Sequence, residues 1–554
     1  MWNVSNKTEL ILGNLFCHLK IISIIFCFSI FCVQGHAKKI IIKIKNTQEQ
    51  KRTLMGKLER MSNTVSLNKK LRKMNGVKSK ALVRLGYVLV DSNDKEMIAN
   101  LKNNPSVQYV EEEIKWKTQS ETNPASLSSA PWLEDTQGLD TVNPAVNALS
   151  SGNRVKVAVI DTGVMTNHNY LNSIISVNTA EANGIAGVDD DGNGYVDDIH
   201  GGNSVSKDGE IGPIDDHGTH VSGLVKIIRD QALADGRFPE ASGVEILPIR
   251  FFDDEGFGST FHAIEALEYA ASQGVKVINA SWGAKGIDSY SQALYDAFKD
   301  LYQTHDIVFT VASGNADFDG ANNNDQVPFF PSSFNIPSLI SVASITPEYN
   351  VLNNLIASDI SDFSNFGAQS VSVAAPGDYI DSMGNHDGVI SASYGVDSSG
   401  NLTTDYVGKQ GTSMAAPVVA GIAAVIRAIN PSLTSYEVTQ VIYQSAQSNN
   451  DLLGKVSTGA QVHAEQAFLL AQNTVSQGLN PAVDSSRVIR GFQGTQPVSS
   501  ASQSSSGGSS SGCGAIHSGS SNSFNDLLAG NSLLLLMSLY LLFLSVRKRK
   551  FLGV

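Results

Sequence analysis

Short apolar runs alternate with longer segments of helical periodicity between residues 155 and 342. A helix between two strands returns the chain to the same end of a sheet, so the strands pair in parallel. We therefore expect an α/β fold, with a parallel sheet covered by helices on both faces and ligands beyond the carboxyl ends of its strands. The predicted strands are Val155–Ile160, Val244–Ile249, Val275–Asn279, Ile307–Val311 and Leu339–Val342, and the predicted helices are Ser259–Ser272 and Ser289–Tyr302.

The first 37 residues have the organisation of a secretory signal peptide. Lys7 and Lys20 precede the apolar run 21–33, and small residues follow up to Ala37. For an uncleaved membrane anchor the run is short, because a span needs roughly 20 residues. The chain is therefore expected to be exported. Three of its four cysteines lie in this segment, so only Cys513 remains and no disulfide is expected in the exported body.

Residues 38–118 are expected to form a separate small α+β unit. Strands are predicted at 40–45, 86–90 and 107–110, and a short helix at 94–103. From Lys38 to Lys117 the chain carries 19 Lys and Arg against 8 Asp and Glu, whereas Thr118 to Val546 carries 15 against 44. Opposite charges favour contact between the two parts, and the acidic body argues against nucleic acid as a partner.

The composition changes twice beyond residue 475. Residues 476–526 are rich in Ser and Gly and are predicted to be a flexible linker. Residues 527–546 are apolar over about the length of a bilayer span and are followed by the basic tail 547–554. By the positive-inside rule the tail lies in the cytoplasm and the acidic body outside. We therefore expect this transmembrane segment to bring the chain to a membrane.

Cys513 stands among small residues shortly before the predicted span. The pattern resembles the C-terminal sorting signals of some Gram-negative surface proteins. The resemblance implies that the span is removed and that the new end is attached to the envelope. A permanent single-pass anchor is the alternative, and both stay open. The protein is thus expected at the cell envelope or surface, anchored or sorted there, or released from it.

A serine stands at the start of a predicted small-residue helix. Gly411–Pro417 contains Ser413 and is followed by the apolar run Val418–Ile429. Small neighbours leave room for another backbone to approach the hydroxyl, and a helix N-terminus favours negative charge. This environment suits a nucleophile. Ser is also a common N-cap, so the two interpretations separate only if a base and an acid are found elsewhere.

Three further polar residues stand where such a site needs them. Asp161 ends the first predicted strand, Asn315 follows another, and His217 opens a predicted helix. In acyl transfer His217 takes the proton of Ser413, and Asp161 fixes the imidazole tautomer and stabilises its cation. Asn315 and the backbone N–H of Ser413 then stabilise the oxyanion. Asp161 alone also fits a turn, and His217 with His220 also fits a metal pair, although no third ligand stands at zinc spacing.

Four motifs together resemble the subtilisin-type serine proteases of the subtilase superfamily. They are Val159–Gly163, His217–Gly223, Ser313–Asn315 and Gly411–Pro417, and the likeness covers roughly residues 132–472. The order Asp, His, Ser separates the chain from α/β-hydrolases, in which the serine comes first.

The resemblance implies a function for most of the chain. Residues 119–475 are expected to be a subtilisin-like peptidase domain that needs no cofactor for catalysis and acts on polypeptides. Residues 38–118 resemble the family's inhibitory and chaperoning propeptide. Ser281, Trp282 and Gly283 correspond to the segment that pairs with an extended substrate, and Phe329 to Pro331 are expected to shape the neighbouring pocket.

An acidic loop is expected to bind a structural calcium ion. Its oxygen ligands would be Asp189, Asp191, Asn193, Asp197 and the backbone carbonyl of Tyr195, at the spacing of an EF-hand loop. The twelfth position is His200 in place of Glu, so a bidentate carboxylate must come from elsewhere, for which Asp198 is a candidate. The alternative is an acidic, solvated turn. Calcium here would stabilise the fold and take no part in the chemistry.

Two functions of different classes remain in view. The first is an exported serine endopeptidase that is made as a propeptide-inhibited zymogen. The second is a catalytically inactive surface protein of the same fold that binds peptides in the cleft. The presence of Asp161, His217, Asn315 and Ser413 favours the enzyme. An esterase is disfavoured by the order of these residues and by the propeptide.

Overall fold

The computed structural model describes residues 38–45, 54–74, 77–83, 85–118, 121–122, 154–349, 355–380 and 386–478. The predicted signal peptide, transmembrane segment and basic tail lie outside these residues, as does nearly all of the predicted linker. One described helix, α9 (Thr412–Ile429), is long and apolar enough to cross a membrane, but it is wholly buried in the protein. It is therefore a core helix.

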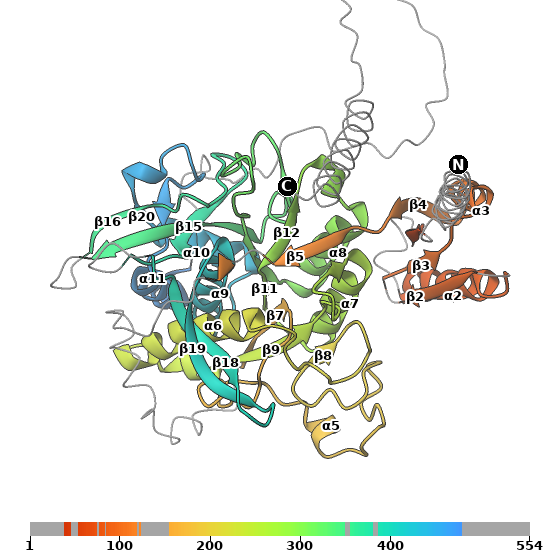
Figure 1. Ribbon diagram of the computed structural model, residues 1–554, viewed down its shortest axis with the longest axis horizontal. Helices are drawn as coiled ribbons and strands as arrows, with labels where there is room; N and C mark the ends of the chain where they lie inside the picture. Colours follow the sequence, from red (N-terminus) through yellow and green to blue (C-terminus); the bar gives the residue numbers. More distant parts are fainter. Residues whose placement is uncertain are drawn as a thin grey trace, which may run out of the picture. The chain divides into compact units, whose positions relative to one another are not determined.

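A ten-stranded sheet lies at the centre of residues 154–478 (Figure 1). The strand order is β20-β21-β17-β15-β13-β11-β7-β9-β8, and β16 pairs with β15. All neighbours from β17 to β8 pair in parallel, which confirms the predicted parallel sheet. Its strands are β7 (Val155–Asp161), β8 (Gly202–Asn203), β9 (Val244–Arg250), β11 (Val277–Ala280), β13 (Val308–Ala312), β15 (Leu339–Tyr349), β16 (Leu355–Ile360), β17 (Val373–Pro376), β20 (Gln447–Ser448) and β21 (Ala460–Gln461).

Helices cover both faces of this sheet, as the sequence predicts. Alternate residues of β7 show the division, because Val157 and Val159 belong to one hydrophobic core and Ala158 and Ile160 to the other. The first core contains residues of α6 (His217–Asp235), α9, α10 (Ser435–Ser445) and α11 (Ala464–Gln477), and the second contains residues of α7 (Thr260–Ser272) and α8 (Gln292–His305).

One predicted helix begins later than expected. The prediction was Ser289–Tyr302, whereas α8 runs from Gln292 to His305. Residues Ile287–Ser289 form a separate 3-10 turn, and the Ser291 side chain caps α8 by accepting from the Leu294 N–H. Ser289 and Ser291 are both suitable N-cap residues, and Ser291 is the one that caps α8.

Residues 39–112 form a second, antiparallel sheet with the order β2-β3-β1-β4. The predicted strands and helix are confirmed as β1 (Lys39–Ile44), β3 (Tyr87–Asp91), β4 (Val107–Glu112) and α3 (Lys95–Lys102). The sequence reading missed α2 (Leu54–Leu71) and β2 (Lys78–Leu82). The middle of α2 contains Ser62, Asn63 and Thr64, which are weak helix formers, so local propensity gives little sign of the helix.

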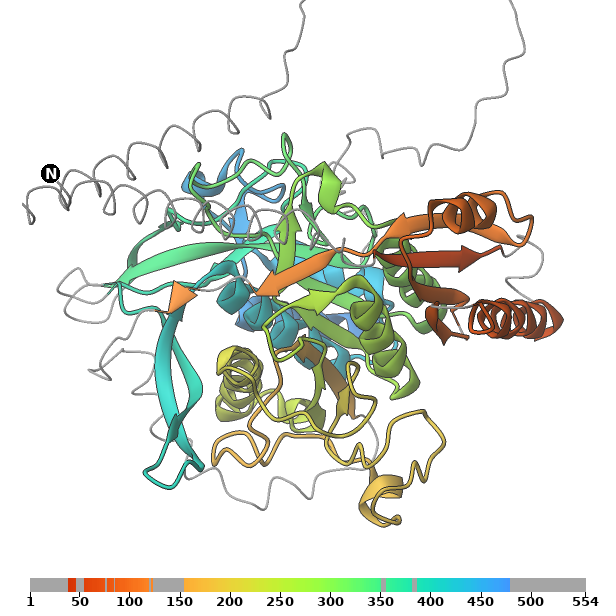
Figure 2. The ribbon, with the colours of Figure 1, turned by 45° about the vertical axis from the view of Figure 1, so that its right-hand side comes forward.

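The chain leaves this small sheet as an extended segment that runs onto the larger body (Figure 2). Strand β5 (Lys115–Thr118) enters a four-stranded sheet of order β10-β5-β12-β14. Strand β6 (Glu121–Thr122) then pairs with β19, which forms the long hairpin of Figure 1 with β18. The remaining strands and the short helix are β10 (Gly258–Ser259), β12 (Trp282–Lys285), β14 (Phe329–Phe330), β18 (Val389–Val396), β19 (Leu402–Gln410) and α5 (Thr179–Ala182).

Candidate active site

The Asp161 carboxylate and the His217 imidazole are in contact at the carboxyl edge of the sheet. Asp161 is the last residue of β7 and His217 the first of α6, and Asp161 Oδ1 lies 2.7 Å from His217 Nδ1. Both side chains are buried. A carboxylate only accepts, so Nδ1 carries the proton and Nε2 presents its lone pair. Nε2 has no hydrogen-bond partner among the described residues, so it can act as a base.

Two residues that the sequence analysis did not single out join the end of β7 to the start of α6. The Asp215 carboxylate accepts from the Thr162 hydroxyl at 2.7 Å and from the His217 N–H at 2.9 Å. Thr162 Oγ1 in turn accepts from the Gly218 N–H at 3.1 Å. The sequence does indicate this bond, because Asp side chains commonly accept from the backbone N–H two residues further on. These bonds fix the distance between the acid and the base.

Ser413, the second residue of α9, is held by a reciprocal pair of hydrogen bonds with Ser281. Ser413 Oγ donates to the Ser281 carbonyl at 2.9 Å, and Ser281 Oγ donates to the Ser413 carbonyl at 2.9 Å. Ser281 follows β11, which lies between β7 and β13, so the serine reaches the same edge as Asp161. The hydroxyl bonds to Ser281 and not to His217 Nε2. Hydrogen bonds between a nucleophile and its base are often long or poorly aligned in structures without a bound substrate, and they tighten when substrate binds.

The Asn315 amide is oriented by the residue next to the serine. Asn315 Oδ1 accepts from the Thr412 N–H at 3.0 Å and from the Thr412 hydroxyl at 2.8 Å. Thr412 Oγ1 also accepts from the Gly314 N–H at 3.2 Å. The oxygen end of the amide is therefore engaged by Thr412, so Nδ2 is the end that can donate. Of the predicted residues, the structure thus brings Asp161, His217, Asn315 and Ser413 to one edge.

An ion pair between a buried lysine and a half-buried aspartate joins the residue before His217 to the strand before Ser413. Lys409 Nζ lies 2.7 Å from Asp216 Oδ1, and Asp216 Oδ2 accepts from the Ser393 hydroxyl at 2.8 Å. Lys409 is 2% exposed and stands four residues before Ser413, whereas Asp216 precedes His217. Burial alone raises the pKa of the Asp216 carboxyl, but the Lys409 ammonium and the Ser393 hydroxyl together lower it below its usual value.

His220, the second histidine of the His-x-x-His pair, has a structural partner. Its Nε2 hydrogen bonds to the Val407 carbonyl at 3.0 Å, and the side chain is fully buried. Burial and the nearby charge of Lys409 lower the pKa of His220 to about 3, so the ring is neutral. His220 therefore connects α6 to the hairpin strand β19. No metal role is needed to explain it.

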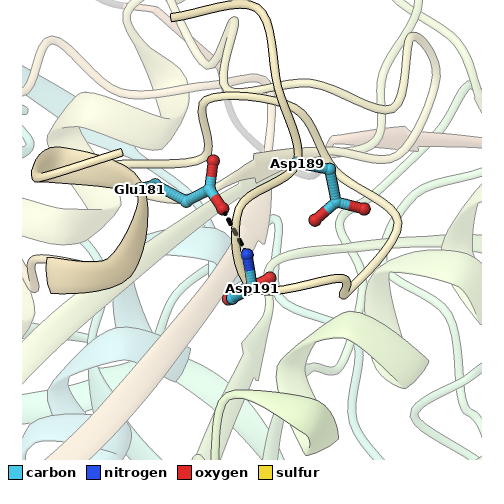
Figure 3. A group of neighbouring side chains, drawn as sticks. All are labelled: Glu181, Asp189 and Asp191. Atoms are coloured by element: carbon cyan, nitrogen blue, oxygen red, sulfur yellow. Dashed lines mark hydrogen bonds between the residues drawn. The ribbon is translucent and has the colours of Figure 1, made fainter. Parts of the chain in front are cut away.

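The acidic loop brings together Asp189, Asp191 and a residue that the sequence analysis missed. Oxygens of Glu181, Asp189 and Asp191 lie within 4.8 Å of one another (Figure 3). Glu181 comes from α5 and is buried, and its two oxygens accept from the N–H groups of Asp191 at 2.9 Å and Asp197 at 3.1 Å. It stands eight residues before Asp189, and nothing in the loop's own spacing points to it.

Two of the other predicted ligands, Asp197 and Asn193, form hydrogen bonds within the loop. Asp197 Oδ2 accepts from the Gly187 N–H at 2.7 Å, and the Asn193 amide donates to Asp191 and Asp198 at 3.0 and 2.9 Å. Burial raises the pKa of the Asp198 carboxyl. Three converging carboxylates fit a hard cation, because calcium takes oxygen ligands and the charges repel without it. We propose that Glu181, Asp189 and Asp191 hold a structural calcium ion.

The edge predicted to bind substrate is occupied by the chain's own strand β5. Gly283 pairs with Lys117 and Trp282 with Thr118 in an antiparallel register. The aromatic side chain of Phe329 lies against this edge, since a Cβ at Gly283 would stand 2.2 Å from its Cε1. A Cβ at Gly314 would stand 2.8 Å from Phe329 Cδ2. The ring thus fills the space beside both glycines.

The sequence model of the subtilase family matches residues 152–469, so the chain belongs to the subtilase family. Subtilisin-like protease 1 of Plasmodium vivax is 30% identical over 381 residues, which cover 66% of this chain and 54% of that protein. Fervidolysin of Fervidobacterium pennivorans is 29% identical over 306 residues, which cover 54% of this chain and 38% of that protein. The chain thus spans about half the length of the first relative and less of the second.

A solved structure supports the fold. The crystal structure of fervidolysin, described as a keratinolytic enzyme related to subtilisin, matches with a TM-score of 0.51 at 22% identity. The match covers 79% of this chain and 62% of that one. The subtilisin-like α/β fold expected from the sequence is therefore confirmed.

Replacing Lys409 by methionine should lower the free energy of unfolding by roughly 1–3 kcal/mol. The change leaves the Asp216 carboxylate without a counter-ion but with its Ser393 hydrogen bond, and the loss stays below the ~3–5 kcal/mol of a fully buried pair because the Asp216 side chain is 24% exposed. Urea unfolding in a Ser413→Ala background measures it without self-digestion. The matched control adds Asp216→Asn and should recover most of the loss. A single variant as stable as its parent would contradict this assignment.

Chelation of calcium should lower the melting temperature of the protein. The carboxylates of Glu181, Asp189 and Asp191 then repel one another without a cation between them. Calorimetry with and without a chelator measures the shift, again in a Ser413→Ala background. The double variant Asp189→Asn, Asp191→Asn is the matched control and should melt at the same temperature in both conditions. An unshifted parent protein would count against the calcium site.

Proposed function

We propose that the chain is a serine endopeptidase that is made as an autoinhibited precursor. The observation that carries the proposal is the contact of Asp161 with His217 at the sheet edge where Ser413 and Asn315 also stand. A protein that only binds peptides has no need for a buried carboxylate, such as that of Asp161, bonded to Nδ1 of a histidine. It also has no need for that histidine, His217, to have an Nε2 that is unpartnered among the described residues. We therefore favour the enzyme over that alternative.

In the proposed reaction the side chains act in sequence on a bound peptide. Ser413 Oγ attacks the scissile carbonyl as His217 Nε2 takes its proton, and Asp161 stabilises the imidazolium through Nδ1–H. Asn315 Nδ2 and the Ser413 N–H donate to the oxyanion. His217 then gives the proton to the leaving amine, which departs and leaves an acyl-serine. Water, deprotonated by the same nitrogen, attacks the ester, and Ser413 is released with its proton.

The small sheet supports the proposal that residues 38–118 are an inhibitory propeptide. Its Glu111 carboxylate accepts from the Ser291 hydroxyl at 2.6 Å and from the N–H groups of Gln292 and Ala293 at 3.1 and 3.3 Å, at the start of α8. Glu113 accepts from the Phe261 N–H at 3.3 Å, at the start of α7. Anionic groups at helix N-termini are stabilising, so two helices of the body hold the segment in place.

The contact between the basic segment 38–118 and the acidic body depends on more than their opposite net charges. The ion pair Lys80–Glu265 does join the basic segment to the acidic body, at 3.1 Å. The helix caps, however, use Glu111 and Glu113, which are acidic residues of the basic segment. Tyr87 adds a bond from its hydroxyl to the Ala293 carbonyl at 3.0 Å and is buried. Directed hydrogen bonds and apolar packing thus complement the net charge.

The register of β5 indicates where the precursor is cut. An extended chain that continues β5 by one residue in this register stands opposite Ser281, whose carbonyl accepts from Ser413 Oγ. Further along, Glu121 pairs with Gln410, three residues before Ser413. The described residues on either side of positions 119 and 120 are therefore paired with segments that lie next to Ser413. We infer that maturation cuts the bond between residues 119 and 120, which themselves lie outside the described residues.

The variant Ser413→Ala tests the enzyme and its maturation together. Turnover of a protein substrate such as casein should fall by on the order of 10³-fold or more, because the nucleophile is lost. The variant precursor should stay uncut, whereas the parent should begin at Ser120 by mass spectrometry. Ser445→Ala, a serine of α10 away from the site, is the control. Equal turnover would refute the peptidase, and normal processing of Ser413→Ala would show that another protease cuts it.

Acid should loosen the segment through His262 of α7. Burial lowers the pKa of His262 to about 3, and the charges of three lysines act in the same direction. Two of them, Lys39 and Lys80, belong to the small sheet. Release removes the charges of Lys39 and Lys80, so the pKa of His262 rises toward its usual value of ~6.5 and the ring takes up a proton more readily. Protonation of His262 therefore weakens the contact as the pH falls below ~6.5.

The weakening of the contact on protonation of His262 predicts how the rate of activation depends on pH. From pH 7.5 to pH 5, the rate at which the cut complex gains activity should change on the order of tenfold more favourably in the parent than in His262→Gln, which cannot be protonated in this range, since one pKa unit is worth a factor of ten. Burial raises the pKa of Glu111 to about 7 in the complex, so protonation of Glu111 strengthens the contact at low pH in both proteins. Comparing the two proteins cancels the contribution of other titrating groups. Identical profiles for parent and variant would rule out this role of His262.

A further inference from the structure

One face of the small sheet packs against the larger body, and its other face packs against helices α2 and α3. Along β1, Ile41 belongs to the hydrophobic core that contains residues of α7 and α8. Its neighbours Ile40 and Ile42 belong to a separate core, which also contains Leu71 of α2. Helix α2 therefore lies on the side of the small sheet that faces away from the larger body (Figure 1).

The outward side of α2 carries exposed apolar side chains. Thr64 and Leu71 of this helix are buried, whereas Met61 is 37% exposed and Val65 is 50% exposed. These two residues stand one helical turn apart, so they share one side of the helix. Met74, shortly after the helix, is 43% exposed. Single exposed apolar residues are common on protein surfaces, so the charges around these three residues decide what they indicate.

A cluster of cations stands around these apolar residues. From Leu54 to Lys80 the chain contains eight Lys and Arg but one acidic residue, Glu59. Lys80 pairs with Glu265 of the body at 3.1 Å. Five other cations are exposed, and the structure pairs none of them with a carboxylate of a described residue; they are Lys69, Lys70, Arg72, Lys73 and Lys78. We call these five cations together with Met61, Val65 and Met74 the outer basic face.

We propose that the outer basic face docks the precursor onto a lipid bilayer that contains anionic headgroups. Lys and Arg are attracted to the negative potential of such a surface, and apolar side chains among them enter the boundary between headgroups and acyl chains. Nucleic acid would attract the same charges, but it would leave the three exposed apolar side chains without an apolar contact. The segment 527–546, expected from the sequence to span a membrane, would bring the chain to such a surface.

Docking on the bilayer and contact with the body use different sides of the small unit. Glu111 and Glu113 cap the helices of the body, and Lys80 pairs with Glu265. None of these residues belongs to the outer basic face. The bilayer therefore holds the segment while the segment still covers the sheet edge, and it keeps hold of the segment after the cut. This docking does not depend on the peptidase function, because the outer basic face lies within residues 38–118.

Amide hydrogen exchange of the Ser413→Ala precursor tests the docking and locates it. The precursor is placed in nanodiscs of phosphatidylcholine, and in matched nanodiscs in which part of this lipid is replaced by phosphatidylglycerol. At low salt, residues 61–74 should exchange on the order of tenfold more slowly in the anionic nanodiscs, because docking holds the helix against the bilayer. The difference should vanish in 1 M salt, where the screening length is ~3 Å.

Substitutions in the outer basic face separate its charges from its apolar residues. Replacing Lys69, Lys70 and Lys73 together by Gln should abolish the slowing, since three charges near such a surface change binding on the order of 100-fold. In phosphatidylcholine this variant should exchange like the parent, which shows that the helix is still folded. Met61→Ser with Val65→Ser should reduce the slowing and keep its salt dependence. The matched control, which should behave like the parent, replaces three lysines of the body by Gln: Lys156, Lys299 and Lys455.

Three results would contradict the docking. Equal exchange of residues 61–74 in the two kinds of nanodisc would overturn the proposal. Slowing that survives in the triple lysine variant would overturn the assignment to these charges. Slower exchange with a DNA duplex but not with phosphatidylglycerol would overturn the lipid partner in favour of nucleic acid. Ser413-dependent casein turnover by the processed parent is unaffected in each case, whereas failure of the peptidase function removes that turnover.

Discussion

The contact between Asp161 and His217 depends on the direction of the strands. Because β7, β11 and β13 pair in parallel, their carboxyl ends meet at one edge, and Asp161, Ser281 and Asn315 stand on neighbouring strands. Helix α6 starts at the same edge and presents His217 to the acid at 2.7 Å. Each side chain is placed by a regular element, so packing of the two cores on the sheet supports the geometry of the site.

Ser413 and the residues near it are joined to this edge by three sets of bonds. Ser281 exchanges two hydrogen bonds with Ser413, Thr412 holds the oxygen of Asn315, and Lys409 pairs with Asp216 beside the base. Ser413, His217 and Asn315, the proposed nucleophile, base and oxyanion donor, are therefore linked through the residues next to them. The chain's own strand β5 lies across the same surface and pairs with the residues after Ser281. In the proposed precursor, one register serves both inhibition and the cut that ends it.

Much of this arrangement could be predicted from the sequence, and the reasons are physical. Alternating apolar runs give the parallel sheet, and a polar residue directly after a strand must lie at the carboxyl edge, as Asp161 does. Contacts between segments that are distant in the sequence were harder to predict. Glu181 contacts the acidic loop only when α5 folds onto it, and nothing in its local sequence carries that information. The pairing of Lys409 with Asp216 was missed for the same reason.

The central claim is that Ser413 is an activated nucleophile covered by residues 38–118 until they leave. Labelling with a fluorophosphonate, which phosphonylates activated serines, tests it directly when followed by peptide mapping. The account predicts an adduct on Ser413 in the processed protein after the segment has dissociated, and much slower labelling of the precursor. It also predicts slow labelling in His217→Ala, because the base is lost. Absence of an adduct on Ser413 in the processed protein, or equally fast labelling in His217→Ala, would contradict it.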